Sequence, residues 1–270
     1  MAYINNTAWG TFLENMKGAL RPVFQKMQKT IDMITPDKPS TLGLGVYDGF
    51  SVAYRKNTTD ELVFNYSFSK DIFFEGVPEY KPAEDHVIIE VGAHIGTFSV
   101  FAASKLKRGH VYAVEPSSDS SNYLRINAAL NRCDNISVHQ LALADQEGVA
   151  FLYYDTGTWG HSTVSGFSGT GEAVKATTLA KFMEENRIEK CDFMKFNCEG
   201  AEFPIILSTP PEVLGRFGVI LILYHSDLWK KNSEADLVAH LEKSGFHCEV
   251  RNKAAGRGWI IAVNEHRKEQ

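Results

Sequence analysis

Apolar residues recur at helical spacing in the first part of the chain, with basic residues between them. The apolar positions are Trp9, Phe12, Leu13, Met16, Leu20, Val23, Phe24, Met27 and Ile31, and the basic ones are Lys17, Arg21, Lys26 and Lys29. This spacing predicts an amphipathic helix with a kink near Pro22. Its apolar face would pack on its own domain or on a second copy of the chain, or lie on a membrane surface as basic amphipathic helices do.

Residues 35–49 are rich in Pro, Gly, Ser and Thr, which predicts a linker. Residues 50–57 alternate like a strand, and residues 60–74 indicate a helix or a mixture of helix and strand. We therefore expect an N-terminal helix and linker over residues 1–40, a cap segment over 41–85 and the main domain over 86–270.

From His86 onward, strand-like and helix-like segments alternate. The expected strands are 87–91, 110–116, 135–143, 149–154, 191–197, 218–225, 246–252 and 258–264, and the expected helices are 97–107, 119–132, 178–187, 234–244 and one that opens near residue 200. The alternation predicts an α/β fold with a mostly parallel sheet covered by helices on both faces. Residues 155–173 break the pattern with many Gly, Ser and Thr, and their length predicts a functional loop.

Composition narrows the classes of partner and compartment. The net charge of −5 and the pI near 6.0 give no electrostatic reason to expect a nucleic-acid partner. The cysteines, Cys133, Cys191, Cys198 and Cys248, form no C-x-x-C pair, which indicates buried thiols in a reducing compartment and no zinc site. No apolar run is long enough to span a membrane and no secretory signal is visible, so we expect a cytoplasmic protein.

The turn after the first strand of the main domain carries the clearest chemical signal. A dinucleotide fingerprint would need glycine at positions 92, 94 and 97, and the chain has Gly92, His94 and Thr97. This occupancy disfavours a diphosphate and hence a nicotinamide cofactor. The turn instead suits a nucleoside without phosphates, because Gly92 permits a sharp bend and Gly96 permits close approach of helix and strand.

Two acidic residues end neighbouring predicted strands. Glu90 can receive an ammonium group, and Glu115 follows the second strand. A carboxylate offers acceptors for two vicinal ribose hydroxyls, with each bond to a charged group contributing about 1.5–3 kcal/mol. We therefore expect Glu115 to hold a ribose.

Several segments resemble, in order and spacing, the FkbM-type family of S-adenosylmethionine-dependent methyltransferases over about residues 50 to 264. They are "IIEVGAHIGTFS", "VYAVEPSSDSSNYLRINAALN", "QLALADQEG", "ATTLAKFM" and "CDFMKFNCEGAEFPIIL". The resemblance implies a Rossmann-like class I methyltransferase fold with a seven-stranded sheet, an antiparallel last strand and S-adenosylmethionine as cofactor. The family usually has Asp at 90, Asn at 94 and Asp at 197, where this chain has Glu90, His94 and Asn197, and the last change removes a charge.

The resemblance also implies cofactor contacts. It places the methionine moiety against Glu90, Gly92 and Gly96, the ribose against Glu115, and the adenine against residues 141–143. The complete set that we expect to bind the cofactor is Glu90, Gly92, Ala93, His94, Gly96, Glu115, Pro116, Ala142, Leu143 and Asn197.

The segment after the strand at 191–197 supplies the candidate catalytic residues. Glu199 could act as general base, metal ligand or acceptor of a sugar hydroxyl, or be a first-turn carboxylate favoured by the helix dipole. His225 ends the next strand and is a candidate base, because imidazole titrates near neutral pH. Lys195 is a third catalytic candidate, since a buried cation needs the cleft or a carboxylate. Glu202 and His161 are candidate substrate contacts. The oxygen ligands are too generically spaced to predict a metal.

The sequence therefore predicts a methyltransferase that uses S-adenosylmethionine to methylate a hydroxyl on a small molecule. The resemblance favours a sugar, a glycolipid or a polyketide-like acceptor. Two alternatives stay open: a nucleoside-binding protein without turnover, suggested by Asn197 in place of an acid, and an NAD-dependent oxidoreductase. The chain could also form a homo-oligomer.

Overall fold

The computed structural model describes residues 41–64 (without the side chain of Leu62), 67–68, 72–155, 157–158, 160–164, 166 and 169–267. The helix predicted in residues 1–40, and its packing or membrane contact, lie outside the described residues.

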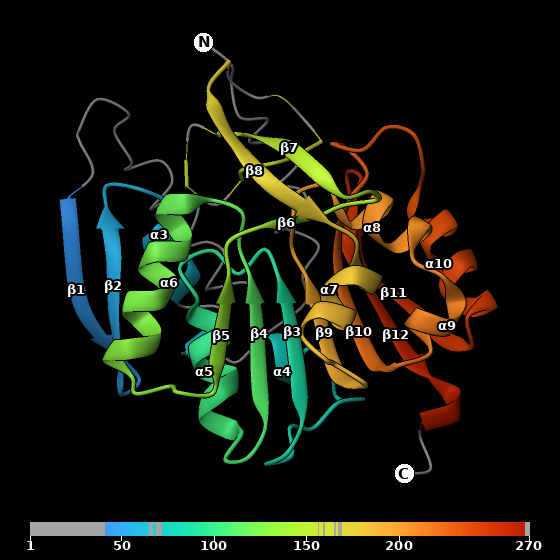
Figure 1. Ribbon diagram of the computed structural model, residues 1–270, viewed down its shortest axis with the longest axis horizontal. Helices are drawn as coiled ribbons and strands as arrows, with labels where there is room; N and C mark the ends of the chain where they lie inside the picture. The colour runs from blue at the N-terminus through green and yellow to red at the C-terminus, as the bar shows by residue number, and fades with distance from the viewer. Residues whose placement is uncertain are drawn as a thin grey trace.

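A seven-stranded sheet forms the centre of the described structure (Figure 1). Its order is β11 (Phe246–Ala254), β12 (Arg257–Asn264), β10 (Phe217–His225), β9 (Cys191–Phe196), β3 (Val87–Val91), β4 (His110–Val114) and β5 (Ile136–His139). The run from β10 to β5 is parallel, and β12 is antiparallel to both of its neighbours. The predicted α/β class, the parallel sheet and the antiparallel last strand are confirmed, and this is the Rossmann-like class I methyltransferase arrangement.

The strand order reverses between β3 and β9. The chain first runs outward from β3 to β4 and β5, then returns to β9 on the other side of β3. Ligands of open α/β sheets bind beyond the carboxyl ends of the strands at such a reversal. The backbone is tight there, since the N–H of Asn197 donates to the carbonyl of Val91 at 3.0 Å.

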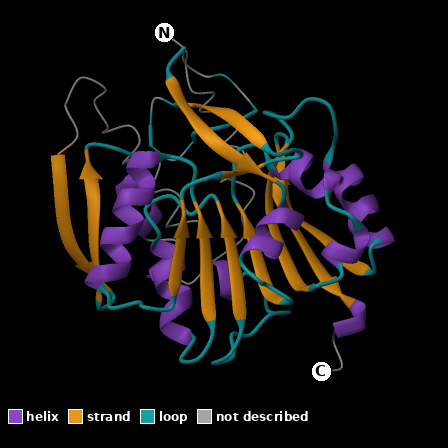
Figure 2. Ribbon diagram, viewed as in Figure 1, coloured by secondary structure: helices purple, strands orange, loops and turns teal. Residues whose placement is uncertain are grey.

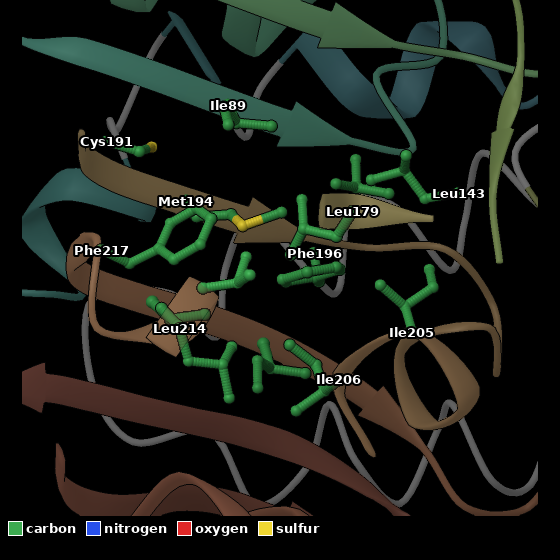
Figure 3. Packing of buried hydrophobic residues seen from close by; sticks show 14 of the residues in the cluster. Ile89, Leu143, Leu179, Cys191, Met194, Phe196, Ile205, Ile206, Leu214 and Phe217 are labelled. Carbon is green, nitrogen blue, oxygen red and sulfur yellow. The ribbon is translucent and has the colours of Figure 1, made fainter. Parts of the chain in front are cut away.

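Helices cover both faces of the sheet, and Figure 2 shows its strands in orange between purple helices. One face packs against α5 (Thr97–Lys105) and the short helices α3 (Asp60–Phe64) and α4 (Ile72–Glu75). The other packs against α7 (Leu179–Glu185), α8 (Glu202–Ser208), α9 (Pro211–Leu214) and α10 (Glu234–Lys243) (Figure 3). Successive strand residues such as Ile88 and Ile89 bury opposite faces, which explains the continuous apolar runs.

A smaller sheet lies over the carboxyl ends of β3, β4 and β5 in the view of Figure 1. It contains β6 (Ala142–Leu143), β8 (Gly171–Thr177) and β7 (Gly148–Tyr153). The single strand predicted over 135–143 is wrong, because the chain leaves the central sheet after His139 and β6 pairs with β8 instead. The sequence did not predict β8, which begins inside a glycine-rich segment.

The predicted linker over 35–49 is wrong from residue 41, where β1 (Thr41–Tyr47) begins a hairpin with β2 (Phe50–Lys56). Both residues of the connecting turn, Asp48 and Gly49, have positive φ, as a two-residue hairpin turn of type I′ requires. Gly43 is needed for packing, because a Cβ there would lie 2.5 Å from the ring of Tyr54.

Helix α6 (Ser118–Leu130) joins this hairpin to the main domain. The side-chain amide of Asn127 donates to the carbonyls of Ala53 at 3.0 Å and Ile95 at 2.7 Å, and its oxygen accepts from the N–H of Ala53 at 2.7 Å. One buried side chain thus connects β2, the turn before α5, and α6.

No helix in the described part of the chain is long and apolar enough to cross a membrane. All the cysteines lie in the described ranges and are free thiols, with Cys191 buried and the others partly buried.

Candidate active site

A cavity opens beyond the carboxyl ends of β3, β4 and β9, at the reversal of strand order. Most of the residues expected to bind a cofactor line it: Glu90, Gly92, Ala93, His94, Glu115, Pro116, Ala142, Leu143 and Asn197. The catalytic candidates Glu199 and Lys195 and the substrate candidate His161 line it as well. Gly96, Glu202 and His225 do not belong to its lining.

Glycine is required at two positions around the turn after β3. Gly92 has φ +78°, and a Cβ there would lie 2.0 Å from the carbonyl oxygen of Asn197. Gly96 has φ +81° and precedes α5, where a Cβ would lie 2.6 Å from the side chain of Leu124. Gly92 therefore shapes the cavity wall, whereas Gly96 allows α5 and α6 to approach.

Glu115 follows β4 and is 7% exposed. Its Oε2 accepts from the N–H of His94 at 2.7 Å and its Oε1 from the N–H of Ser117 at 2.9 Å. Burial raises the pKa of Glu115, while His94 and the two backbone donors oppose that rise. Since a carboxylate has about four acceptor positions, each oxygen retains capacity for a ligand hydroxyl in the cavity.

Glu90 and Lys195 form a buried ion pair, with 2.9 Å between Oε1 and Nζ. The other oxygen of Glu90 accepts from Ser99 Oγ at 2.5 Å. The ammonium of Lys195 also lies over the rings of Phe73 and Phe98, 4.7 and 5.3 Å from their centroids. In this pair Lys195 serves as counter-charge to Glu90.

His94 has φ +53° and carries a side chain that faces a buried charged pair. Its Nε2 lies 3.2 Å from Asp60 Oδ1, and Arg55 donates to both oxygens of Asp60 at 2.8 and 3.0 Å. Burial alone would raise the pKa of Asp60, but His94 and Arg55 lower it. Within the described structure, His94 Nδ1 and Asn197 Oδ1 are buried polar atoms without a hydrogen-bond partner, at residues that line the cavity.

Three titratable side chains, Glu202, His225 and Glu199, contact one another in series from behind the cavity wall to the cavity itself. Glu202 Oε1 accepts from the backbone N–H of His225 at 2.6 Å and lies 3.1 Å from its Nδ1. His225 Nε2 lies 3.5 Å from Glu199 Oε1. Glu199 is the member that reaches the cavity, and Arg257 Nη1 lies 3.7 Å from its other oxygen.

The charges of Glu202, His225 and Glu199 influence one another's pKa values. Burial lowers the pKa of His225, but the carboxylates of Glu199 and Glu202 raise it above its usual value. Burial would raise the pKa of Glu202, and His225 brings it below its usual value. Burial raises the pKa of Glu199, against the opposing effect of His225 and Arg257.

The backbone also fixes Glu199. Its φ is +50°, and its carbonyl accepts a hydrogen bond from Ser162 Oγ at 2.7 Å. Glu202 is fully buried, and its Oε2 accepts from the N–H of Gly200 at 3.0 Å. Glu202 thus holds His225 and the turn after Glu199, behind the cavity wall and away from the position expected for a substrate contact.

His161 lies in the glycine-rich loop and lines the cavity. Its Nδ1 accepts from the N–H of Asp155 at 3.1 Å. Burial, with His94 and Arg55 nearby, lowers the pKa of His161 to about 4. The ring is therefore neutral at pH 7 with its proton on Nε2, where it can donate to a ligand.

Sequence comparison adds the decisive observation. A model of the Methyltransferase FkbM domain matches residues 90–248, more than half of the chain. The chain belongs to the FkbM methyltransferase family.

Two curated relatives are similar to this FkbM methyltransferase. The AMB antimetabolite synthetase AmbE of Pseudomonas aeruginosa is 31% identical over 267 residues, which cover 81% of this chain and 12% of AmbE. The chain therefore spans only a small part of AmbE. Methyltransferase 1 of Beauveria bassiana is 22% identical over 181 residues, covering 59% of this chain and 72% of that protein.

Solved structures show similar chains at low identity. TYW2 of M. jannaschii in complex with AdoMet has a TM-score of 0.45 and 18% identity, covering 83% of this chain and 85% of that one. A putative rRNA-methylase from Clostridium thermocellum has a TM-score of 0.47 and 10% identity, covering 71% of this chain and 92% of that one.

Several residues of the FkbM site were missed by sequence reasoning, among them Arg55, Asp60 and Arg257. Arg55 and His94 are 39 positions apart, with 3.3 Å between Nη2 and Nε2. Thr158 of the loop donates to Asp60 at 2.5 Å, which ties the loop to the cap. No local motif signals these contacts, because each joins segments distant in the sequence.

Proposed function

We propose that this FkbM methyltransferase takes its methyl group from S-adenosylmethionine and transfers it to a hydroxyl oxygen of a small molecule. The acceptor class that we propose from the family resemblance is a sugar, a glycolipid or a polyketide-like compound. The observation that carries the proposal is Glu115, a buried carboxylate with acceptor capacity that lines the cavity beside the Gly92 turn.

The residues present fit this donor. Glu115 offers acceptors for the two ribose hydroxyls, and the apolar side chains of Leu141 and Leu143 offer walls for the adenine. Asn197 lines the cavity, and its Oδ1, which has no hydrogen-bond partner, offers an acceptor for an ammonium group. The side chain at position 94 occupies the place where a diphosphate fingerprint has glycine, which disfavours the NAD-dependent oxidoreductase.

When bound, S-adenosylmethionine supplies an activated methyl group, so the protein must align the acceptor and remove its proton. We assign Glu199 as the base that accepts this proton, because it lines the cavity and contacts His225. His225 and Arg257 favour the ionised form of Glu199, and Glu202 orients His225 through its Nδ1. Glu202 is therefore a positioning residue in this proposal.

Two variants test donor and base separately. Glu115→Ala should weaken binding of S-adenosylhomocysteine by about 1.5–3 kcal/mol, the contribution of charge-assisted hydrogen bonds. Calorimetry measures this, with Glu147→Ala at an exposed position as control. Equal affinity of Glu115→Ala and the wild type would count against the ribose assignment.

Glu199→Gln should lower turnover by roughly 10²–10⁴-fold, the usual contribution of a general base, and leave donor affinity nearly unchanged. Turnover is measured as transfer of labelled methyl from the donor to acceptors in a cell extract, with the exposed Glu212→Gln as control. Donor binding without any methyl transfer by the wild type would favour the alternative of a binding protein without turnover, which Asn197 suggests.

We also propose a cytoplasmic location, supported by the free thiols, and a small-molecule partner in preference to nucleic acid, supported by the net charge of −5.

A further inference from the structure

The cavity extends past the Gly92 turn along the sheet face that α3, α4 and α5 cover. Its far part is lined by apolar side chains that come from the cap, from α5 and from the sheet. We name this part the aromatic arm and define it by Val63, Ile72, Phe73, Phe98, Leu223 and Trp259.

Aromatic rings form the walls of the aromatic arm. The rings of Phe73 and Trp259 lie nearly parallel, with centroids 6.3 Å apart and an interplanar angle of 21°. Phe73 also meets Phe98 edge to face, with centroids 5.2 Å apart. Leu223 on β10 is the cross-strand neighbour of Trp259 on β12, so these two side chains lie side by side.

The polar groups that border the aromatic arm bond to one another. Ser67 Oγ and Thr97 Oγ1 lie 3.0 Å apart, and Lys195 is paired with Glu90. A sugar entering the arm would lose water at several hydroxyls and find few partners there. Burying an unpaired hydroxyl costs about 1–3 kcal/mol in proteins, whereas an apolar ring gains from the same burial.

The aromatic arm lies next to the proposed base and away from the nucleoside residues. Leu223 and His225 are two positions apart on β10, so their side chains leave the same face of the sheet. His225 contacts Glu199, which lines the same cavity. Glu115 and Leu143 lie on the other side of β3, at β4 and β6.

We infer that the aromatic arm binds the apolar, ring-bearing part of the acceptor. The substrate is then an alcohol on an aromatic carbon skeleton, in preference to a free sugar. The inference rests on the proposed methyl transfer: the acceptor oxygen bonds to the methyl carbon, the carbon–sulfur bond of the donor breaks with its electron pair left on sulfur, and the hydroxyl proton passes to Glu199.

Two neighbouring phenylalanines provide a matched test. Phe73 and Phe74 share α4 and are 7% and 6% exposed, but only Phe73 lines the cavity. Calorimetry with 2-naphthol and with glucose, each with and without S-adenosylhomocysteine, measures the affinity of the wild type, Phe73→Leu and Phe74→Leu. Circular dichroism verifies that each variant is folded.

We expect 2-naphthol to bind the wild type and glucose to bind far more weakly. Phe73→Leu should lose about fivefold in affinity for 2-naphthol, as for removal of one aromatic contact of about 1 kcal/mol, and Phe74→Leu should lose little. S-adenosylhomocysteine should bind all three proteins equally. If Phe73→Leu does not fold, Leu223→Ser takes its place, because Leu223 is only partly buried.

Three outcomes would overturn the aromatic arm: no binding of 2-naphthol, equal binding of glucose, or equal losses in Phe73→Leu and Phe74→Leu. A different result would overturn the proposed function alone. If the wild type binds 2-naphthol through Phe73 but does not bind S-adenosylhomocysteine, the aromatic arm stands and the methyl donor is wrong.

Discussion

The ion pair between Glu90 and Lys195 gives the sharpest prediction for stability. Both side chains are nearly inaccessible, at 2% and 3% exposure, and their charged atoms lie 2.9 Å apart. Lys195→Met keeps the length of the side chain and removes the cation. It leaves the carboxylate of Glu90 buried with Ser99 as its remaining side-chain donor.

We expect Lys195→Met to lower the free energy of unfolding by about 3–5 kcal/mol, the cost of breaking a buried ion pair from one side. Glu90→Gln should lower the free energy of unfolding by a similar amount, because it leaves the ammonium of Lys195 buried without a charged partner. The double variant should cost much less than the sum, since replacing both partners leaves no unpaired charge.

Urea denaturation at pH 7, followed by circular dichroism, gives the free energies of the wild type and the three variants. The slopes of the transitions must agree, so that the midpoints report stability alone. The reasoning would be refuted if the two single costs added within about 0.5 kcal/mol in the double variant, the limit for independent sites.

Three further predictions address the turn, the cap and the loop. Gly92→Ala should abolish measurable binding of S-adenosylhomocysteine in calorimetry, because its Cβ would lie 2.0 Å from the carbonyl oxygen of Asn197. Asn127→Ala should lower the free energy of unfolding by about 2–4 kcal/mol, since it removes three hydrogen bonds of about 0.5–1.5 kcal/mol each; an equal urea midpoint would contradict this. The pKa of His161 is lowered from 6.5 to about 4, so the folded state binds fewer protons than the unfolded state between these values. Stability should fall as the pH drops from 6.5 towards 4, and His161→Asn should lose less in urea titrations at pH 7 and pH 4.5.

The central sheet could be predicted because its strands are buried on both faces. The runs "VIIEV" and "VILIL" are apolar at consecutive positions except for Glu90, and the helices between them have their own periodicity. The hairpin of β1 and β2 could have been found from Asp48 and Gly49, the usual pair of a type I′ turn. The Pro, Gly, Ser and Thr content of residues 35–49 suggested a linker instead, although Gly43 faces the ring of Tyr54.

The site was predictable only where it depends on local sequence. Gly92 and Glu115 follow strands, so their place at the carboxyl edge comes directly from the order of elements. The roles of Glu202 and His225 depend on how α8 packs beside β10, which no local pattern contains. The same holds for Lys195, whose charge partner is 105 positions earlier in the chain.

The hydrogen bond from Ser162 to the carbonyl of Glu199 connects the glycine-rich loop with the proposed base. Since the loop residue and the proposed base share this bond, a loop insertion that admits bulkier compounds would also shift the carboxylate. The range of acceptors and the rate of methyl transfer therefore both depend on the hydrogen bond between Ser162 and the carbonyl of Glu199. Engineering for new acceptors should begin at Phe73 or Leu223, which line the aromatic arm, and keep Ser162 unchanged.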